Sequence, residues 1–173
     1  MLLNFYAGKQ VKKEPMLEQT YQKLTRELEH LKTVERSTIA KVIDEARALG
    51  DLKENAEYHA AKEKQGMIEA RIIELGDILS RSHIIDPSSL AHTRVCFGST
   101  VKLIDLDSDE VVTYTIVGSQ ESKPSHGLIS IFSPLAKALL GKAEGDEIEV
   151  TLPNGEKCYE ISSICYQEIC IKE

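Results

Sequence analysis

The stretch "ALGDLKENAEY" (residues 48–58) decides the fold of the N-terminal half, because it is a short break between two long helical patterns. On either side of it, apolar and aromatic residues recur in alternating steps of three and four. The first series runs from Leu17 to Leu49 with one slip, and the second runs from Tyr58 to Leu79 with one polar member, Gln65. Such steps are typical of a coiled-coil seam. A connection this short makes the two helices antiparallel. The sequence therefore predicts an antiparallel coiled-coil hairpin over residues 16–83.

The slip in the first helix follows Leu31, and the series resumes at Ile39. The predicted seam beyond the slip consists of Ile39, Val42, Ala46 and Leu49. Charged residues between the seam positions, such as Glu27, Glu63 and Lys64, are expected on solvated faces.

The hydrophobic period changes after the segment "IIDPSSLAHT" (residues 84–93), whose Pro, Ser and Thr content is typical of a linker. Five runs rich in β-branched and aromatic residues follow, separated by turn signals of which "PNG" (153–155) is the most diagnostic. One helical patch, "SPLAKALLGK" (133–142), has Ser133 as N-cap and Pro134 at its first position. Residues 94–173 are thus predicted to form a small α+β domain, an antiparallel sheet with one short helix.

Charge and composition argue against binding of free nucleic acid and against a membrane-spanning protein. The net charge is −7, distributed as +2 over residues 1–15, −2 over 16–83 and −7 over 84–173. An acidic chain lacks the basic footprint that free nucleic acid requires. No run of apolar residues is long enough for a membrane span, and residues 1–15 do not form a signal peptide, so we expect a cytoplasmic protein with no membrane contact. The four cysteines contain no C-x-x-C pair and are expected to be reduced thiols.

Two carboxylates, Asp51 and Glu54, lie three residues apart at the predicted turn, and two interpretations are open. In the first, Gly50 ends one helix and Asp51 N-caps the next, with Glu54 completing a capping box. In the second, both carboxylates are hard oxygen ligands for Mg²⁺ that are completed by a site on another protein. Local sequence favours the cap, but the two roles do not exclude each other.

The stretch "ARALGDLKENAEYHAAKEKQGMIEARIIEL" (46–75) resembles the N-terminal hairpin of the bacterial transcript cleavage factors, the Gre family. The runs "FGSTVKLIDLDSDEVVTYTIVG", "ISIFSPLAKALLGKAEGDEIEV" and "TLPNGEKCYEI" resemble the C-terminal half of the same family, in the same order. The resemblance extends from about Pro15 to nearly the end of the chain, and residues 1–15 form an extension outside the family pattern.

The resemblance implies a function. If the chain works as this family does, its C-terminal domain is expected to have an FKBP-like fold and to bind bacterial RNA polymerase, and its coiled coil is expected to enter the secondary channel. Its two acidic residues, which fall on Asp51 and Glu54, help to hold a Mg²⁺ ion of the polymerase. The polymerase then hydrolyses the backtracked nascent RNA near its 3′ end by two-metal chemistry. The protein is expected to be a monomeric activator and not an enzyme, with no cofactor of its own beyond the shared Mg²⁺.

Other residues receive secondary roles. The family's basic patch near the tip falls on Arg47 and Lys62. Lys53 is a further candidate for attracting the RNA end. For each of these residues, ordinary surface charge is the alternative. Tyr58 either stacks on an unpaired base or, as the heptad favours, packs in the seam. Phe132, Ser133 and Pro134 match the position of the polymerase-docking loop, although Phe132 replaces a polar residue of the family pattern.

Two alternatives to stimulation of transcript cleavage are open. One is a related factor that occupies the channel and inhibits the polymerase, which the ordinary acidic pair at the turn disfavours. The other is a peptidyl-prolyl isomerase, which needs an aromatic-lined pocket that this chain, with no Trp and three Phe, is poorly equipped to build.

Overall fold

The computed structural model describes residues 13–48, 54–153 and 155–169. They form two compact units: Tyr21–Ser82, and Lys13–Thr20 together with the described part of His83–Glu173. The segment before Tyr21 thus packs with the C-terminal unit, whereas the sequence prediction assigned residues from 16 onward to the hairpin.

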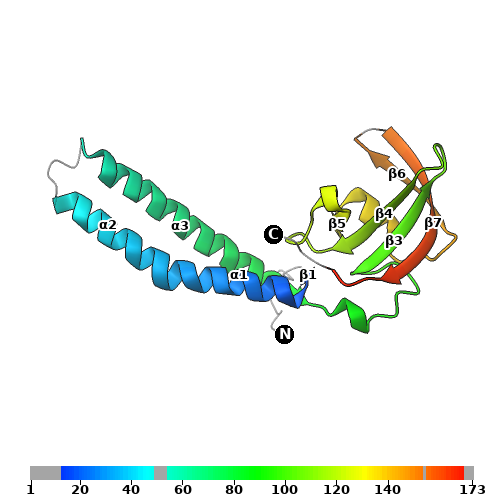
Figure 1. Cartoon of the computed structure of the whole chain (residues 1–173), viewed down its shortest axis with the longest axis horizontal. Helices are drawn as coiled ribbons and strands as arrows, with labels where there is room; N and C mark the ends of the chain where they lie inside the picture. The colour runs from blue at the N-terminus through cyan, green and yellow to red at the C-terminus, as the bar shows by residue number, and fades with distance from the viewer. Residues whose placement is uncertain (1–12, 49–53, 154, 170–173) are drawn as a thin grey trace, which may run out of the picture. The chain divides into compact units, whose positions relative to one another are not determined.

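The first unit is a hairpin of two long helical arms (Figure 1). The first arm consists of α1 (Glu18–His30), a π-helical segment (Leu31–Glu35) and α2 (Arg36–Ala48), and the second arm is α3 (Ala56–Arg81). The π-helical segment lies at the predicted slip of the seam, and the backbone N–H of Arg36 bonds to the carbonyl of Leu31, five residues earlier. A π turn holds one extra residue, which explains why the apolar spacing skips there without ending the helix.

The arms are joined by a seam of buried side chains. Its members are Ile39, Ile43, Ala61, Ile68 and Ile72, with Leu28, Leu31 and Tyr58 packed against them. The seam differs from the prediction at two positions. Val42 is 41% exposed while its neighbour Ile43 is 5% exposed, and Leu17 packs in another apolar cluster, with Phe97. The predicted member Leu49 lies outside the described residues. Positions 42 and 43 lie on either side of the line through Ile39 and Ala46, and both are apolar, so spacing alone did not distinguish them.

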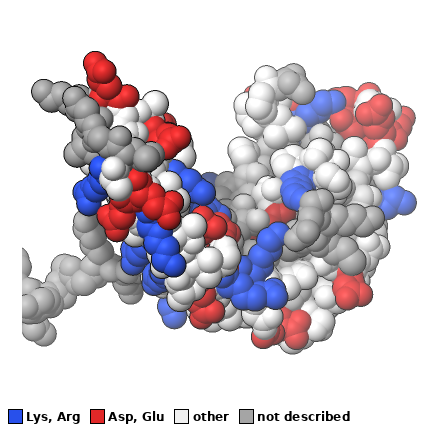
Figure 2. Space-filling view, turned by 60° about the vertical axis from the view of Figure 1, so that its left-hand side comes forward, with Lys and Arg blue, Asp and Glu red and all other residues white. Residues whose placement is uncertain are grey.

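Ion pairs connect the arms along their flanks. Arg36 of α2 donates to Glu69 of α3 with Nε···Oε1 of 2.7 Å, and Arg71 of α3 donates to Glu27 of α1 with Nε···Oε1 of 2.7 Å. Elsewhere on the hairpin, Lys and Arg side chains are interspersed with Asp and Glu on the face seen in Figure 2. The prediction of solvated charged faces is confirmed.

The second unit is built on a five-stranded sheet in the order β5-β4-β3-β7-β6. The strands are β3 (Ser99–Asp105), β4 (Val111–Val117), β5 (Leu128–Ser130), β6 (Glu147–Leu152) and β7 (Gly155–Tyr166). Each of the five predicted β runs overlaps one of these strands. The prediction of a wholly antiparallel sheet is wrong, because β5 pairs with β4 in parallel. The chain after β4 returns through a short 3₁₀ helix (Pro124–His126) before β5 begins.

Helix α4 (Pro134–Leu139) confirms the predicted helical patch, and Ser133 Oγ accepts from the N–H of Ala136 at 3.2 Å as its N-cap. The core of this unit joins the helix to the sheet. It consists of Leu135, Ala136 and Leu139 of α4 with Val95, Val101, Leu103, Ile116, Ile129, Ile148, Val150, Tyr159, Ile161 and Ile164.

The N-terminal segment of the described chain lies against this sheet domain. Strand β1 (Glu14–Met16) pairs with β2 (Ser82–Ile84), and a 3₁₀ helix (Pro87–Ser89) follows within the predicted linker. Leu17 packs in a second apolar cluster with Phe97, Val117 and Ile169. Among the described residues, no helix is both long enough and apolar enough to cross a membrane.

Candidate functional site at the closed end of the hairpin

The closed end of the hairpin is the part of the molecule where the predicted carboxylates lie. Helix α2 ends at Ala48 and α3 begins at Ala56. Asp51 and Lys53 fall outside the described residues, so the structure bears only on Glu54 of the predicted acidic pair. Glu54 is exposed and precedes the cap of α3 by one residue.

The N-cap of α3 is Asn55, and the capping box on Asp51 and Glu54 is wrong. The Oδ1 of Asn55 accepts from the N–H of Tyr58 at 3.0 Å, which is the bond that defines an N-cap. Because the helix begins four residues later than expected, Glu54 is not its third residue. The sequence contains a signal for this cap, because Asn is among the best N-cap residues and directly precedes the helical pattern. The Asp-x-x-Glu spacing is a competing signal that resembles a capping box.

The amide of Asn55 makes a second hydrogen bond that sequence analysis did not foresee. Its Nδ2 donates to the carbonyl oxygen of Ala46 at 2.7 Å, from the start of one arm to the end of the other. The last carbonyls of a helix have no intrahelical partner, so this bond satisfies one of them.

The carboxylate of Glu54 can supply one or two ligand oxygens to a metal ion, but not a full coordination shell. A carboxylate is a hard oxygen donor suited to Mg²⁺, which binds proteins through one or two carboxylates and retains water. Within the part of the chain that the structure describes, no three His, Cys, Asp or Glu side chains gather as a metal site. The Glu54 carboxylate is therefore chemically suited to Mg²⁺ as one ligand among several.

The basic residues near this end have partners of their own. Arg47 is exposed, lies 3.5 Å from Asp44 (Nη1···Oδ1), and has its guanidinium 5.9 Å from the centroid of the Tyr58 ring. Lys62 is exposed and donates to Gln65 at 2.7 Å. Tyr58 is half-buried and packs against the seam, which confirms the structural interpretation of that residue.

The second candidate surface is the loop before α4. Phe132 and Ser133 are half-buried, and Pro134 is exposed. The N–H of Phe132 donates to Ser130 Oγ at 3.2 Å, and the hydroxyl of Ser133 is used as the helix cap. These bonds fix the loop, which leaves Pro134 and the exposed part of Phe132 as its outer surface.

Comparison with known proteins identifies the class to which this architecture belongs. A family model described as "Transcription elongation factor, N-terminal" matches residues 14–84, and one described as "Transcription elongation factor, GreA/GreB, C-term" matches residues 90–166. The two matches correspond to the helical hairpin and the sheet domain, so the class is that of the transcription elongation factors.

Individual relatives agree with the family models. "Transcription elongation factor GreA" of Sulfurovum sp. (strain NBC37-1) is 65% identical, with 93% of this chain and 99% of that protein covered. The protein of the same name from Helicobacter pylori (strain Shi470) is 58% identical, with 93% and 98% covered. The crystal structure of GreA factor homolog 1 (Gfh1) of Thermus thermophilus is 30% identical, with 88% and 99% covered and a TM-score of 0.41. The chain belongs to the GreA/GreB family of transcription elongation factors.

Proposed function

We propose that this protein stimulates the Mg²⁺-dependent cleavage of backtracked nascent RNA by bacterial RNA polymerase, which rescues arrested elongation complexes. One observation supports this most directly: in a chain of the GreA/GreB family, an exposed carboxylate, Glu54, lies at the closed end of a long helical hairpin. A helical arm of this kind suits delivery of a side chain into a narrow channel.

The roles of the tip residues follow from their chemistry. Asp51 and Glu54 contribute carboxylate oxygens to a Mg²⁺ ion shared with the polymerase and orient the attacking water. Bound there, the ion would polarise the scissile phosphate and lower the pKa of water. Neither carboxylate alone completes a coordination shell, so the protein acts as an activator and not as an enzyme.

Arg47, Lys53 and Lys62 attract the extruded 3′ end of the RNA. A phosphate backbone is drawn to Lys and Arg at any sequence, and this attraction falls with salt. Arg47 in addition has its guanidinium near the Tyr58 ring, so its stem is held on the hairpin while its charge remains exposed.

The sheet domain, which we propose to be FKBP-like, docks on the polymerase through the loop of Phe132, Ser133 and Pro134. The protein works as a monomer in the cytoplasm, where bacterial transcription takes place. Stimulation is favoured over channel-blocking inhibition because the relatives of 58 and 65% identity are named transcription elongation factors, and because Asp51 and Glu54 form an ordinary acidic pair at the turn.

The test compares the purified protein on free RNA with the same protein on stalled, backtracked polymerase complexes, both with Mg²⁺. The proposal expects no cleavage of free RNA and faster release of 3′ fragments from the complexes. Cleavage of free RNA would make the protein a nuclease. Suppression of the polymerase's own slow cleavage would make it an inhibitor.

A further inference from the structure

The side chain of Asn55 connects the two arms of the hairpin near their closed end. The amide of Asn55 accepts from the N–H of Tyr58 through Oδ1 at 3.0 Å and donates to the carbonyl of Ala46 through Nδ2 at 2.7 Å. The end of α2 and the start of α3 lie side by side in Figure 1, as this bond requires.

Among the favoured N-cap side chains, only the amide of Asn has an acceptor and an N–H donor on separate atoms. Serine, threonine and aspartate supply the acceptor of an N-cap, but an ionised Asp has no donor, and Ser is too short to reach the second partner. Glutamine has the donor but is not among the favoured N-cap residues. Asn55 is therefore suited to two roles: it caps α3, and it bonds to the end of α2.

The bond from Asn55 to Ala46 is not what holds the two arms of the hairpin together. The arms are already held by the apolar seam from Leu28 to Ile72 and by the ion pairs of Arg36 and Arg71. The bond from Asn55 to Ala46 lies beyond that seam, next to the residues that connect the arms. Its effect is local: it fixes where the backbone leaves α2 in relation to where it enters α3.

We propose that Asn55 is a positioning residue for transcript cleavage, acting through the Glu54 carboxylate that it directly follows. The inference rests on the proposed function. With the cap and the Ala46 bond both made, the peptide between Glu54 and Asn55 is anchored to both arms, so the carboxylate projects from a fixed base. Misplacement of a reacting or ligating group by about 1 Å is enough to cost roughly a hundredfold in rate.

The decisive variant is Asn55→Ser in the full-length protein. Serine keeps the N-cap bond to Tyr58 and loses the bond to Ala46. We expect an unchanged melting temperature and unchanged polymerase affinity. At saturating protein we expect the maximal cleavage rate to fall by about ten- to a hundredfold, and the Mg²⁺ concentration for half-maximal cleavage to rise. Cleavage at the wild-type rate would overturn the proposal, as would a loss explained fully by weaker binding to the polymerase.

A double-mutant comparison with Glu54→Gln separates this inference from the proposed function. If Asn55 acts through Glu54, the variant carrying both changes cleaves no more slowly than Glu54→Gln alone, whereas independent effects would multiply and overturn the proposal. A Glu54→Gln protein with wild-type cleavage would instead refute the proposed role of that carboxylate. Hydrogen exchange provides a readout that needs no polymerase: in Asn55→Ser the N–H of Tyr58 should remain protected, as the retained cap requires.

Discussion

Glu121 and Leu17 are 104 residues apart in the chain and joined by a hydrogen bond: the Oε1 of Glu121 accepts from the backbone N–H of Leu17 at 2.9 Å. The Glu121 side chain is almost fully buried, with 1% of its surface exposed. Leu17 immediately precedes α1 and belongs to the same compact unit as Glu121, so this carboxyl holds the segment before the helix on the sheet domain.

The Glu121–Leu17 contact predicts a pH-dependent stability. Burial raises the pKa of Glu121 above its ordinary value, although the hydrogen bond from the Leu17 backbone N–H acts in the opposite direction. Because the folded-state pKa is the higher one, the unfolded chain loses this proton first, and stability falls as the pH rises through the interval between the two values. Glu121→Gln keeps the Oε1 acceptor and removes the charge. We expect it to raise the melting temperature at pH 7 by a few degrees, with the gain vanishing near pH 4. A gain of the same size at both pH values would contradict this origin.

Near the Glu121–Leu17 contact, position 118 has no room for a side chain larger than that of glycine. A Cβ built there would clash with the carbonyl oxygen of Pro15 and with Oε2 of Glu121. Gly118→Ala should therefore destabilise the protein by about 1–3 kcal/mol in chemical denaturation. The matched control is Gly66→Ala in α3, where a Cβ meets nothing within 4 Å; it should stabilise by about 1 kcal/mol. Equal effects of the two substitutions would refute the steric argument.

Arg71 predicts a coupling between the arms. Its Nε and Nη2 donate to the two oxygens of Glu27 at 2.7 and 3.2 Å, and its Nη1 donates to Glu74 at 2.9 Å. The pair is partly exposed, so a double-mutant cycle of Arg71→Met and Glu27→Gln should give about 0.2–1 kcal/mol, smaller at high salt. A coupling energy of zero would show that the seam alone holds this part of the hairpin.

Phe132 predicts a docking contact. Its side chain is half-buried beside the Ser133 cap and the exposed Pro134. Phe132→Asn should lower the affinity for RNA polymerase by roughly ten- to a hundredfold if the ring is an apolar anchor. The maximal cleavage rate at saturating protein should not change. An unchanged affinity would remove this side chain from the docking surface.

Much of the fold could be predicted because its signals are local. The heptad steps gave both arms, and the slip after Leu31 marks the π-helical segment. The "PNG" turn likewise marked the β6–β7 hairpin, in which Leu152 pairs with Gly155. What could not be predicted depends on tertiary contacts. Nothing local distinguishes Val42 from Ile43 as the seam residue, and the parallel pairing of β5 with β4 is set by the return path of the chain.

The candidate site was predicted in part for a similar reason. Asp51 and Glu54 stood out because acidic pairs at a turn are conspicuous, and the resemblance to the Gre family gave them a role. Asn55 was overlooked because its bond to Ala46 joins residues that are nine apart, across the closed end of the hairpin. Neither a periodicity nor a motif contains that relationship.

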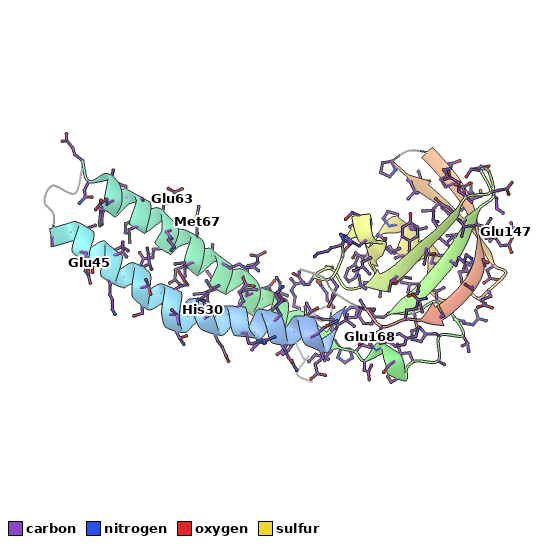
Figure 3. The ribbon with its side chains drawn as sticks, viewed as in Figure 1. His30, Glu45, Glu63, Met67, Glu147 and Glu168 are labelled. Atoms are coloured by element: carbon purple, nitrogen blue, oxygen red, sulfur yellow. The ribbon has the colours of Figure 1, made fainter. Side chains whose placement is uncertain are left out.

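The most direct test of the account is cleavage of backtracked RNA by polymerase complexes saturated with Asp51→Asn or Glu54→Gln protein, with polymerase binding measured in parallel. The control is Glu63→Gln on the outward side of α3, where Glu63 and Met67 lie (Figure 3). We predict that each tip substitution lowers cleavage by roughly ten- to a hundredfold at unchanged binding, while the control cleaves like the wild type. Wild-type cleavage by both tip variants would contradict the central claim that these carboxylates complete the polymerase's metal site.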